Sequence, residues 1–497
     1  MPPMTNLLAI LRLSSSVLVL TLLAGCGSAR PDPPAPPISA PLSASNLNLI
    51  FVVSEDLSYQ ATGDVNPRTA NLTNRGLNRS LQMATFLNQK VLGTKNVTSI
   101  YTLEPMTHLQ TASQLPDMAA FETVQQFAML NQMTLSEVGK TPYTANSYPL
   151  NASYGPGSVP SGVATPTPLF PCVECQGLDF NDQANNNESL VSGIIKTSQP
   201  GFYVFSAPWE TIGSLLANIN QQEGYNLAVP SAYAGPNYVY AISITPSGNA
   251  TLVTYNSNLN PLSTYPDLPA SPNVPASCNA QQHFSITVTG GQGGAVIPAG
   301  INTNETVYWI RHAEAHPKSW YEDGNYVGTG QWRALDLPHA LHGKISPQVV
   351  YSIDPAQILP GSEGLSGQSS WSYVRPSLTV EPYAIATGLP YNLAASFDMI
   401  DQNPPQLSTV ASDFFFRGGR FSNQTLLVAW EHDHIPPTIN ALLASYHGSN
   451  QPAPDWPSPD YDTIWTVKLD AHGNVIVSNA LCEGIDSASL PVTPPQF

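Results

Sequence analysis

The sequence predicts an α/β protein made of two similar halves, each a mostly parallel sheet covered by helices on both faces. Strand-like apolar segments alternate with amphipathic helix-like segments, and helical crossovers of this kind connect parallel strands. Four such segments recur in the same order in both halves of the chain. With 497 residues the chain is also too long for one ordinary core, because domains average about 150 residues. We therefore expect two tandem three-layer α/β/α domains.

The chain begins with a segment typical of export. Residues 1–26 contain an apolar stretch that ends in Leu23-Ala24-Gly25-Cys26, and this pattern resembles a bacterial lipoprotein signal. The resemblance implies cleavage before Cys26, diacylation of that cysteine, and a lipid anchor in the cell envelope with no transmembrane helix left in the mature chain. An ordinary signal peptide or a single spanning helix is the alternative. Residues 27–45 are rich in proline and would form an extended tether.

The composition fits an exported protein and excludes nucleic acid as a partner. Charged residues make up 10% of the chain, against about 25% in an average domain. The formal net charge is −17, so no basic surface is available to neutralise a nucleic-acid backbone. Any phosphate group must be bound locally, by a few of the 17 lysines and arginines.

The repeat consists of a strand, a helix, a second strand, and a strand followed by a helix. The helices open at a glycine and share an arginine, Arg79 in the first half and Arg333 in the second. Gly248 and Gly473 lie in matching hairpin turns near the end of each half. The matched segments are 46–54 with 305–312, 76–87 with 330–341, 100–105 with 350–355, and 202–216 with 427–443.

The repeat places the domain boundaries. We expect a first domain over 46–255, a linker over 256–300, and a second domain over 301–497. Proline and serine cluster in this linker, and Gly290–Gly294 adds flexibility. Residues 283–289 alternate like a strand and are expected at the edge of the second domain.

Four cysteines follow Cys26, and an oxidising compartment favours two disulfides among them. Three pairings are open from the sequence. We favour Cys172 with Cys175, which leaves Cys278 with Cys482. Cys172 and Cys175 lie in a loop rich in proline and glycine, so a structural disulfide is favoured over a redox motif.

Three motifs in the second half carry the chemistry. A strand ends in Ile310-Arg311-His312-Ala313-Glu314, a helix begins with Arg375-Pro376-Ser377-Leu378-Thr379, and another strand ends in Val428-Ala429-Trp430-Glu431-His432. In this order the motifs resemble the histidine phosphatase superfamily, also called phosphoglycerate-mutase-like. The resemblance covers the last 200 residues or so. The segment 361–370, which typical members lack before the arginine helix, is a departure that would shape the pocket or displace Arg375.

The resemblance implies a phosphatase that works through a phosphohistidine. Phosphoryl transfer spreads negative charge over its transition state, so the protein supplies mainly positioning and electrostatics. Arg311 and Arg375 would bind phosphate oxygens and disfavour protonation of His312, which would be the nucleophile. His432 would hold the transferred group, and Glu314 is expected at the substrate. No cofactor and no metal are implied.

A leaving alkoxide also needs a proton, so a carboxylic acid is expected within reach. Asp433, Glu431 and Asp398 are candidates. In acid-phosphatase relatives a His-Asp pair supplies the proton, which favours Asp433. The substrate would be a phosphomonoester on a small molecule or a peptide, and the sequence does not decide which.

The first half lacks all of these groups. Val53-Ser54 stands for the Arg-His pair, Ala119 for the helix arginine, and Ala207 for the second histidine. We therefore expect a phosphatase-like domain without catalysis, which packs on the second domain, binds a partner, or persists as structure.

Two other interpretations remain open from the sequence. The alternate spacing of His312, Glu314 and His316, and of His432 and His434, could build a metal site, although two neighbouring arginines would repel a cation. The second alternative is a surface binding protein in which both domains are inactive. Convergence of the two arginines and two histidines in one cleft would favour the enzyme.

Overall fold

The computed structural model describes residues 40–497 except for several internal segments. The segments left out are 56–63, 108–114, 136–142, 145–146, 153–159, 161, 165–176, 180–181, 183–184, 270–282, 317–322, 357, 360–370, 395–403 and 449–450. The predicted signal, Cys26, most of the tether, Cys172, Cys175, Cys278 and Asp398 therefore lie outside the described residues. Cys482 is disulfide-bonded, and both predicted pairings stay predictions.

The first half contains a six-stranded sheet in the order β12-β11-β1-β10-β4-β9. Its four parallel strands are β1 (Leu47–Val53), β10 (Gly201–Ala207), β4 (Ser99–Thr102) and β9 (Leu150–Asn151). The hairpin of β11 (Tyr238–Ile244) and β12 (Ala250–Asn256) extends one edge in the antiparallel sense.

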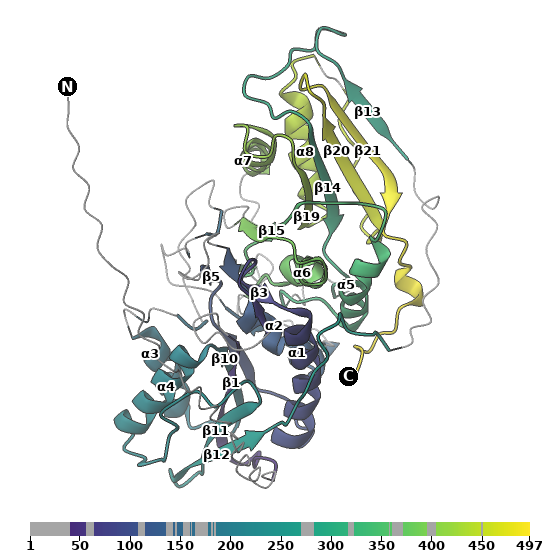
Figure 1. Ribbon diagram of the computed structural model, residues 1–497. Coiled ribbons are helices and arrows are strands. Elements are labelled where there is room, and N and C mark those ends of the chain that lie inside the picture. Colours follow the sequence, from purple (N-terminus) through teal and green to yellow (C-terminus); the bar gives the residue numbers. More distant parts are fainter. Residues whose placement is uncertain are drawn as a thin grey trace, which may run out of the picture. The chain divides into compact units, whose positions relative to one another are not determined.

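Helices cover both faces of this sheet, as the alternation along β1 requires (Figure 1). Ile50 and Val52 pack with α1 (Asn74–Phe86) and α2 (Ala119–Met129). Leu49 and Phe51 pack on the opposite face, with α3 (Asn186–Thr197) and α4 (Trp209–Gln222). A short π-helical turn, Leu87–Val91, continues α1.

The second half has a seven-stranded sheet in the order β13-β21-β20-β14-β19-β15-β18. Its parallel strands are β14 (Glu305–Arg311), β19 (Thr425–Trp430), β15 (Val349–Ile353) and β18 (Tyr391–Ala394). Three antiparallel strands follow at the other edge, namely β20 (Thr463–Leu469), β21 (Val475–Cys482) and β13 (Ser285–Val288). The predicted edge strand near residue 286 is thus part of the second sheet, although it falls inside the predicted linker.

This sheet is also covered on both faces (Figure 1). Trp309 and Trp430 pack with α7 (Pro404–Phe416) and α8 (Ile435–Ala444). Ile310 and Ala429 pack on the other face, with α5 (Gly328–Ala340) and α6 (Arg375–Thr387). The α/β fold class is confirmed, with four parallel strands in each sheet and antiparallel strands added at one edge.

Short elements complete the described structure. These are β2 (Val65–Asn66), β3 (Asn71–Leu72), β5 (Met106–Thr107), β6 (Pro116–Asp117), β7 (Thr134–Leu135), β8 (Tyr143–Thr144), β16 (Ile358–Leu359), β17 (Trp371–Ser372) and a 3₁₀ turn at Ser487–Ser489. In the part of the chain that the structure describes, none of the helices has the length and apolar character needed to cross a bilayer.

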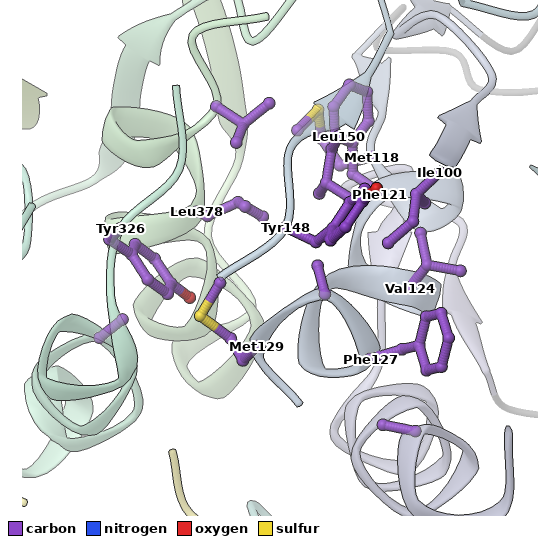
Figure 2. Close-up of a cluster of buried hydrophobic side chains, with 14 of the residues drawn as sticks. Ile100, Met118, Phe121, Val124, Phe127, Met129, Tyr148, Leu150, Tyr326 and Leu378 are labelled. Atoms are coloured by element: carbon purple, nitrogen blue, oxygen red, sulfur yellow. The ribbon is translucent and has the colours of Figure 1, made fainter. Parts of the chain in front are cut away.

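One apolar cluster joins the two halves. Phe121 and Val124 of α2 belong to the same buried cluster as Tyr326 and Leu378 of the second half, as Figure 2 shows. Residues Ile38–Phe497 accordingly form one compact unit. The strand order repeats between the two sheets, while the domain limits expected from the sequence stay a prediction.

Candidate functional site

The Arg-His and Glu-His motifs meet at the carboxyl ends of β14 and β19. These two strands are parallel neighbours, and Arg311 lies opposite Trp430 in their register. The backbone N–H of His312 donates to the carbonyl of Trp430 at 2.8 Å. His312 and the residues that follow Trp430 therefore emerge at the same edge of the sheet, where open α/β sheets bind their ligands.

Arg375 reaches the site as the first residue of α6, with Pro376 next to it in the first turn. The start of α6 is fastened to the loop after β14, because the backbone N–H of Ala313 donates to Oγ1 of Thr379 at 2.8 Å. The same hydroxyl donates to the carbonyl of Arg375 at 2.7 Å. The Arg375 guanidinium lies over the ring of Tyr373, 4.8 Å from its centroid.

Arg311 is a buried cation with an incomplete set of partners. Its guanidinium lies 3.8 Å from the centroid of the Tyr461 ring and donates to the carbonyls of Ser458 and Asp460. Within the described part of the chain, its Nε has no hydrogen-bond partner and no carboxylate forms an ion pair with it. Burial lowers the pKa of Arg311, but an arginine keeps its charge at any ordinary pH.

His312 is held in the neutral form with one ring nitrogen available. Its Nδ1 lies 2.7 Å from the carbonyl of Ala313, and since a carbonyl only accepts, Nδ1 must carry the proton. Nε2 is then the atom with a free lone pair. Burial lowers the pKa of His312 well below its usual value, and the charges of Arg375 and Arg311 lower it further.

His432 presents a second buried nitrogen to the same region. Its side chain is 12% exposed, and Nδ1 has no hydrogen-bond partner among the described residues. Burial and the charge of Arg311 lower the pKa of His432. Nε2 lies 3.4 Å from Oδ1 of Asp433, whose own side chain is 73% exposed.

Glu431 is an anion within this group of cations and imidazoles. Burial alone would raise its pKa, but His434, His312 and Arg375 lower it to about 2. The carboxylate lies 3.5 Å from Nδ1 of His434. A carboxyl group that stays ionised at neutral pH has no proton to give, so the placement disfavours the prediction of Glu431 as general acid.

Glu314 does not lie where the sequence predicts. Both of its oxygens accept from Nε of Arg333, at 2.9 and 3.0 Å, and Arg333 also bonds to Glu483 at 2.5 Å. All three groups are buried. This ion pair is structural, because Arg333 on α5 must be neutralised inside the protein. Glu314 therefore ties the loop after His312 to α5 and is not placed as a substrate ligand.

The predicted metal alternative is not supported by the geometry of its first set. His312, Glu314 and His316 have three different partners, the last being Asp323, at 3.0 Å from Nε2 of His316. Among the described residues, ligand atoms that lie close enough together for one ion come only from Glu431, His432 and Asp433.

The first half repeats the scaffold without the site. Ser54 donates from its backbone N–H to Ala207, as His312 does to Trp430, so Ala207 matches Trp430. The prediction that Ala207 stands for His432 is thus wrong by two residues, and the matching residue is Trp209. Helix α4 begins at Trp209, directly after Pro208, whereas β19 and α8 are separated by four residues. Ala119 begins α2 as Arg375 begins α6.

A buried arginine is common to both halves. Arg79 bonds to Asp64 at 2.5 Å in the first half, as Arg333 bonds to Glu314 in the second. Beside Arg79 lies a cavity of about 20 Å³, lined in part by Val53 and Glu55. A cavity of this size holds about one water molecule, which is too little for a phosphate group.

Comparisons with known proteins found similarity only to solved structures, and at low identity. No known sequence family matches the chain, and no curated protein is similar to it. Among solved structures, the chain is similar to a putative phosphohistidine phosphatase SixA from Agrobacterium tumefaciens, with 15% identity, a TM-score of 0.21, and coverage of 33% of this chain and 92% of that one. A phosphoglycerate mutase from Plasmodium falciparum has 14% identity and a TM-score of 0.22, with 39% and 99% covered. A putative SixA from Nakamurella multipartitia has 16% identity and a TM-score of 0.20, with 40% and 96% covered.

The structure adds two site residues that were not predicted from the sequence, Tyr461 and Tyr373. Tyr461 and Tyr373 each lie against one arginine and also flank the ring of His312, at 6.1 and 6.3 Å between centroids. Tyr373 is two residues before Arg375, so an aromatic beside the helix start was a detectable signal. Tyr461 comes from a loop about 150 residues away in the sequence, and only the folded chain brings it to Arg311.

Proposed function

We propose that the chain hydrolyses phosphomonoesters through a phosphohistidine formed on Nε2 of His312. The observation that carries the proposal is a buried donor, Nε of Arg311, which has no hydrogen-bond partner among the described residues and lies beside a neutral His312. Leaving a buried donor unpaired costs about 1–3 kcal/mol. Such a group is expected where a ligand supplies the acceptor, and a phosphate oxygen suits Nε of Arg311.

The reaction divides into two displacements. Nε2 of His312 attacks phosphorus, the ester P–O bond breaks, and the leaving oxygen takes a proton from a carboxylic acid. Water then attacks the phosphohistidine, and the P–N bond breaks to release phosphate and restore His312. Arg311, Arg375 and His432 offset the charge on the phosphate oxygens in both steps.

Asp433 is the best-placed of the described candidates for the acid. It is adjacent to His432 and is solvent-accessible, whereas Glu431 is held ionised by His434, His312 and Arg375. An Asp433→Asn variant should therefore lose most activity on alkyl phosphates, whose leaving groups need a proton, and less on nitrophenyl phosphate, whose leaving group does not. Equal losses on both substrates would exclude Asp433 as the acid.

The proposal also includes the cellular location of the protein. The lipoprotein-like segment around Cys26 supports a lipid-anchored protein of the cell envelope that acts on a phosphorylated small molecule or peptide outside the cytoplasm. Metabolic labelling with a palmitate analogue, with Cys26→Ser as control, tests the anchor.

The experiment for the activity is hydrolysis of an aryl phosphate by a chain that begins at residue 38, since Leu42 packs in the core and must be kept. His312→Ala should abolish turnover, and the exposed His339→Ala should not. Alkaline quenching should trap a phosphorylated peptide containing residue 312. A folded chain that binds phosphate through Arg311 but turns over none of a broad ester panel would instead be a phosphate-binding protein.

A further inference from the structure

A segment of the first half lies against the elements that carry Arg375. Ser147 through Ala152, which includes β9, contacts the turn Asp323 to Tyr326 and strand β17. Two hydrogen bonds hold this segment, one at each of its ends. Ser147 donates to Oδ2 of Asp323 at 2.6 Å, and Ala152 donates from its backbone to Oγ of Ser372 at 3.0 Å.

A third bond lies between these two. Nδ2 of Asn325 donates to the carbonyl of Tyr148 at 3.1 Å, and Oδ1 of Asn325 accepts from the backbone of Tyr326 at 2.9 Å. The two side chains that bond to the segment, those of Asp323 and Asn325, are fully buried. Buried bonds of this kind fix a geometry, because the partners cannot turn to water if they separate.

The turn in question holds the first residues of α6. The carbonyl of Gly324 accepts from the backbone N–H groups of Val374 and Arg375, at 2.9 and 3.0 Å. Gly324 has a φ of +75°, and a side chain there would meet the carbonyl oxygen of Ser372 at 2.0 Å. The backbone of the turn at Gly324 is thus in direct contact with the backbone of residues 372–375. A shift of the turn must therefore move the start of α6.

We infer that the first half acts as a built-in scaffold for the phosphate site, with Ser147 and its neighbours positioning Arg375 through the turn at Asp323. This inference rests on the proposed function. It gives the first half a role that needs none of the missing catalytic groups: it supplies the fixed surface against which an arginine on a helix end is held. Arg375 is the phosphate ligand, and Ser147 is a positioning residue.

The cluster of Ser147, His316 and Asp323 is not a second hydrolytic centre. In a nucleophilic triad the acid binds one ring nitrogen and the serine the other. Here Asp323 and Ser147 both lie at Nε2 of His316, at 3.0 and 3.3 Å, and the serine donates to the aspartate. Burial by itself would raise the pKa of Asp323, but His316 and the bonds from Ser147 and Asn325 lower it overall. The carboxylate is an anchor.

The test uses two variants that cut the contact at opposite ends, Ser147→Ala and Ser372→Ala, in the full chain. The matched control is Gln126→Ala, because Gln126 is equally buried and also bonds across the halves, to the carbonyl of Pro495 at 2.6 Å, away from Arg375. Each variant is assayed for binding of inorganic phosphate by calorimetry and for hydrogen exchange in a peptide that covers residues 371–378.

We expect both serine variants to bind phosphate about tenfold more weakly, since small displacements of a ligand-binding group are costly, and to exchange faster in that peptide. Gln126→Ala should change neither, even where it lowers the melting temperature. Unchanged exchange and affinity in the serine variants would overturn the inference, and so would an equal loss in Gln126→Ala. If Ser147→Ala fails to fold, Ser372→Ala decides.

The exchange measurement separates this inference from the proposed function. A wild-type chain that neither binds phosphate nor hydrolyses esters would refute the phosphatase. In that chain, faster exchange at residues 371–378 in the serine variants alone would still show that the first half positions the start of α6.

Discussion

Two carboxyl groups are buried against each other between the two halves, and they should make the folded state sensitive to pH. Glu122 lies in the first turn of α2 and Glu381 lies in α6, and both are almost fully buried. They are close enough to share a proton, and no lysine or arginine of the described residues forms an ion pair with either. Burial raises the pKa of Glu122 to about 7, and burial with the charge of Glu122 raises that of Glu381 well above its usual value.

The sign of the effect follows from the proton count. In the unfolded chain a glutamate titrates near pH 4.3, so between about pH 4.3 and pH 7 the folded state holds a proton that the unfolded state has lost. The contribution of Glu122 to the free energy of unfolding is therefore fully present below about pH 4.3, and it is lost as the pH rises from there through about 7. Each pH unit between the two pKa values is worth about 1.4 kcal/mol, which gives about 2.5 kcal/mol lost from pH 5 to pH 8 through Glu122 alone.

The perturbation is Glu122→Gln, which keeps the shape and removes the titration. Urea unfolding of wild type and variant at pH 5, 6, 7 and 8 gives the difference in unfolding free energy at each pH, and titrating groups that do not interact with Glu122 cancel in that difference. We expect the variant to gain about 2.5 kcal/mol relative to wild type between pH 5 and pH 8. The exposed Glu223→Gln is the control and should show no trend. Parallel curves for wild type and Glu122→Gln would refute the argument.

Three further predictions concern the site and its support. Arg375→Lys should weaken phosphate binding by about tenfold or more in calorimetry, because bonds to a charged group are worth about 1.5–3 kcal/mol and the planar fork is lost; unchanged affinity would remove Arg375 from the site. Arg333→Met should cost about 3–5 kcal/mol in urea unfolding at neutral pH, since Glu314 and Glu483 would be left buried without their cation; a cost below about 1 kcal/mol would contradict the structural role. Glu431→Gln should tighten phosphate binding and keep the alkaline limb of the pH–rate profile, because a carboxyl group with a pKa of about 2 carries no proton to donate; loss of that limb would make Glu431 the acid.

The repeat was the part of the fold most open to prediction from the sequence. Matching segments carried Arg79 and Arg333, and both prove to be buried arginines bonded to a carboxylate. A charged residue inside a helix is informative because burial demands a partner. The match failed at the end of β10, where Pro208 starts a helix at once and leaves no loop to align with His432.

The placement of the site was predictable for a topological reason. Arg311 ends β14 and His432 follows β19, and because these strands are parallel neighbours, their carboxyl ends had to meet. Glu314 was predicted at the substrate because the sequence does not show that its carboxylate pairs with Arg333. Tyr461 was missed because it enters from a loop whose path depends on tertiary packing alone.

The first half repeats the fold of the second half without the residues of the proposed site, and packing offers a physical explanation. Helices α5 and α6 carry apolar side chains on the side away from their own sheet, and in this chain α1 and α2 cover them in one shared cluster. Without that cover, Leu378 and Tyr326 (Figure 2) would face water. The turn and the strand that precede α6 would also lose two bonds, the one that Asn325 donates to Tyr148 and the one that Ser372 accepts from Ala152. Burial depends on shape and apolar surface and needs no catalytic histidine. The two arginines of the proposed phosphate site repel each other when no anion is bound, so a rigid surrounding structure is needed to hold them in place. That rigidity depends on the packing of β1, β9 and α2, and it needs no catalytic group at Val53, Ala119 or Trp209.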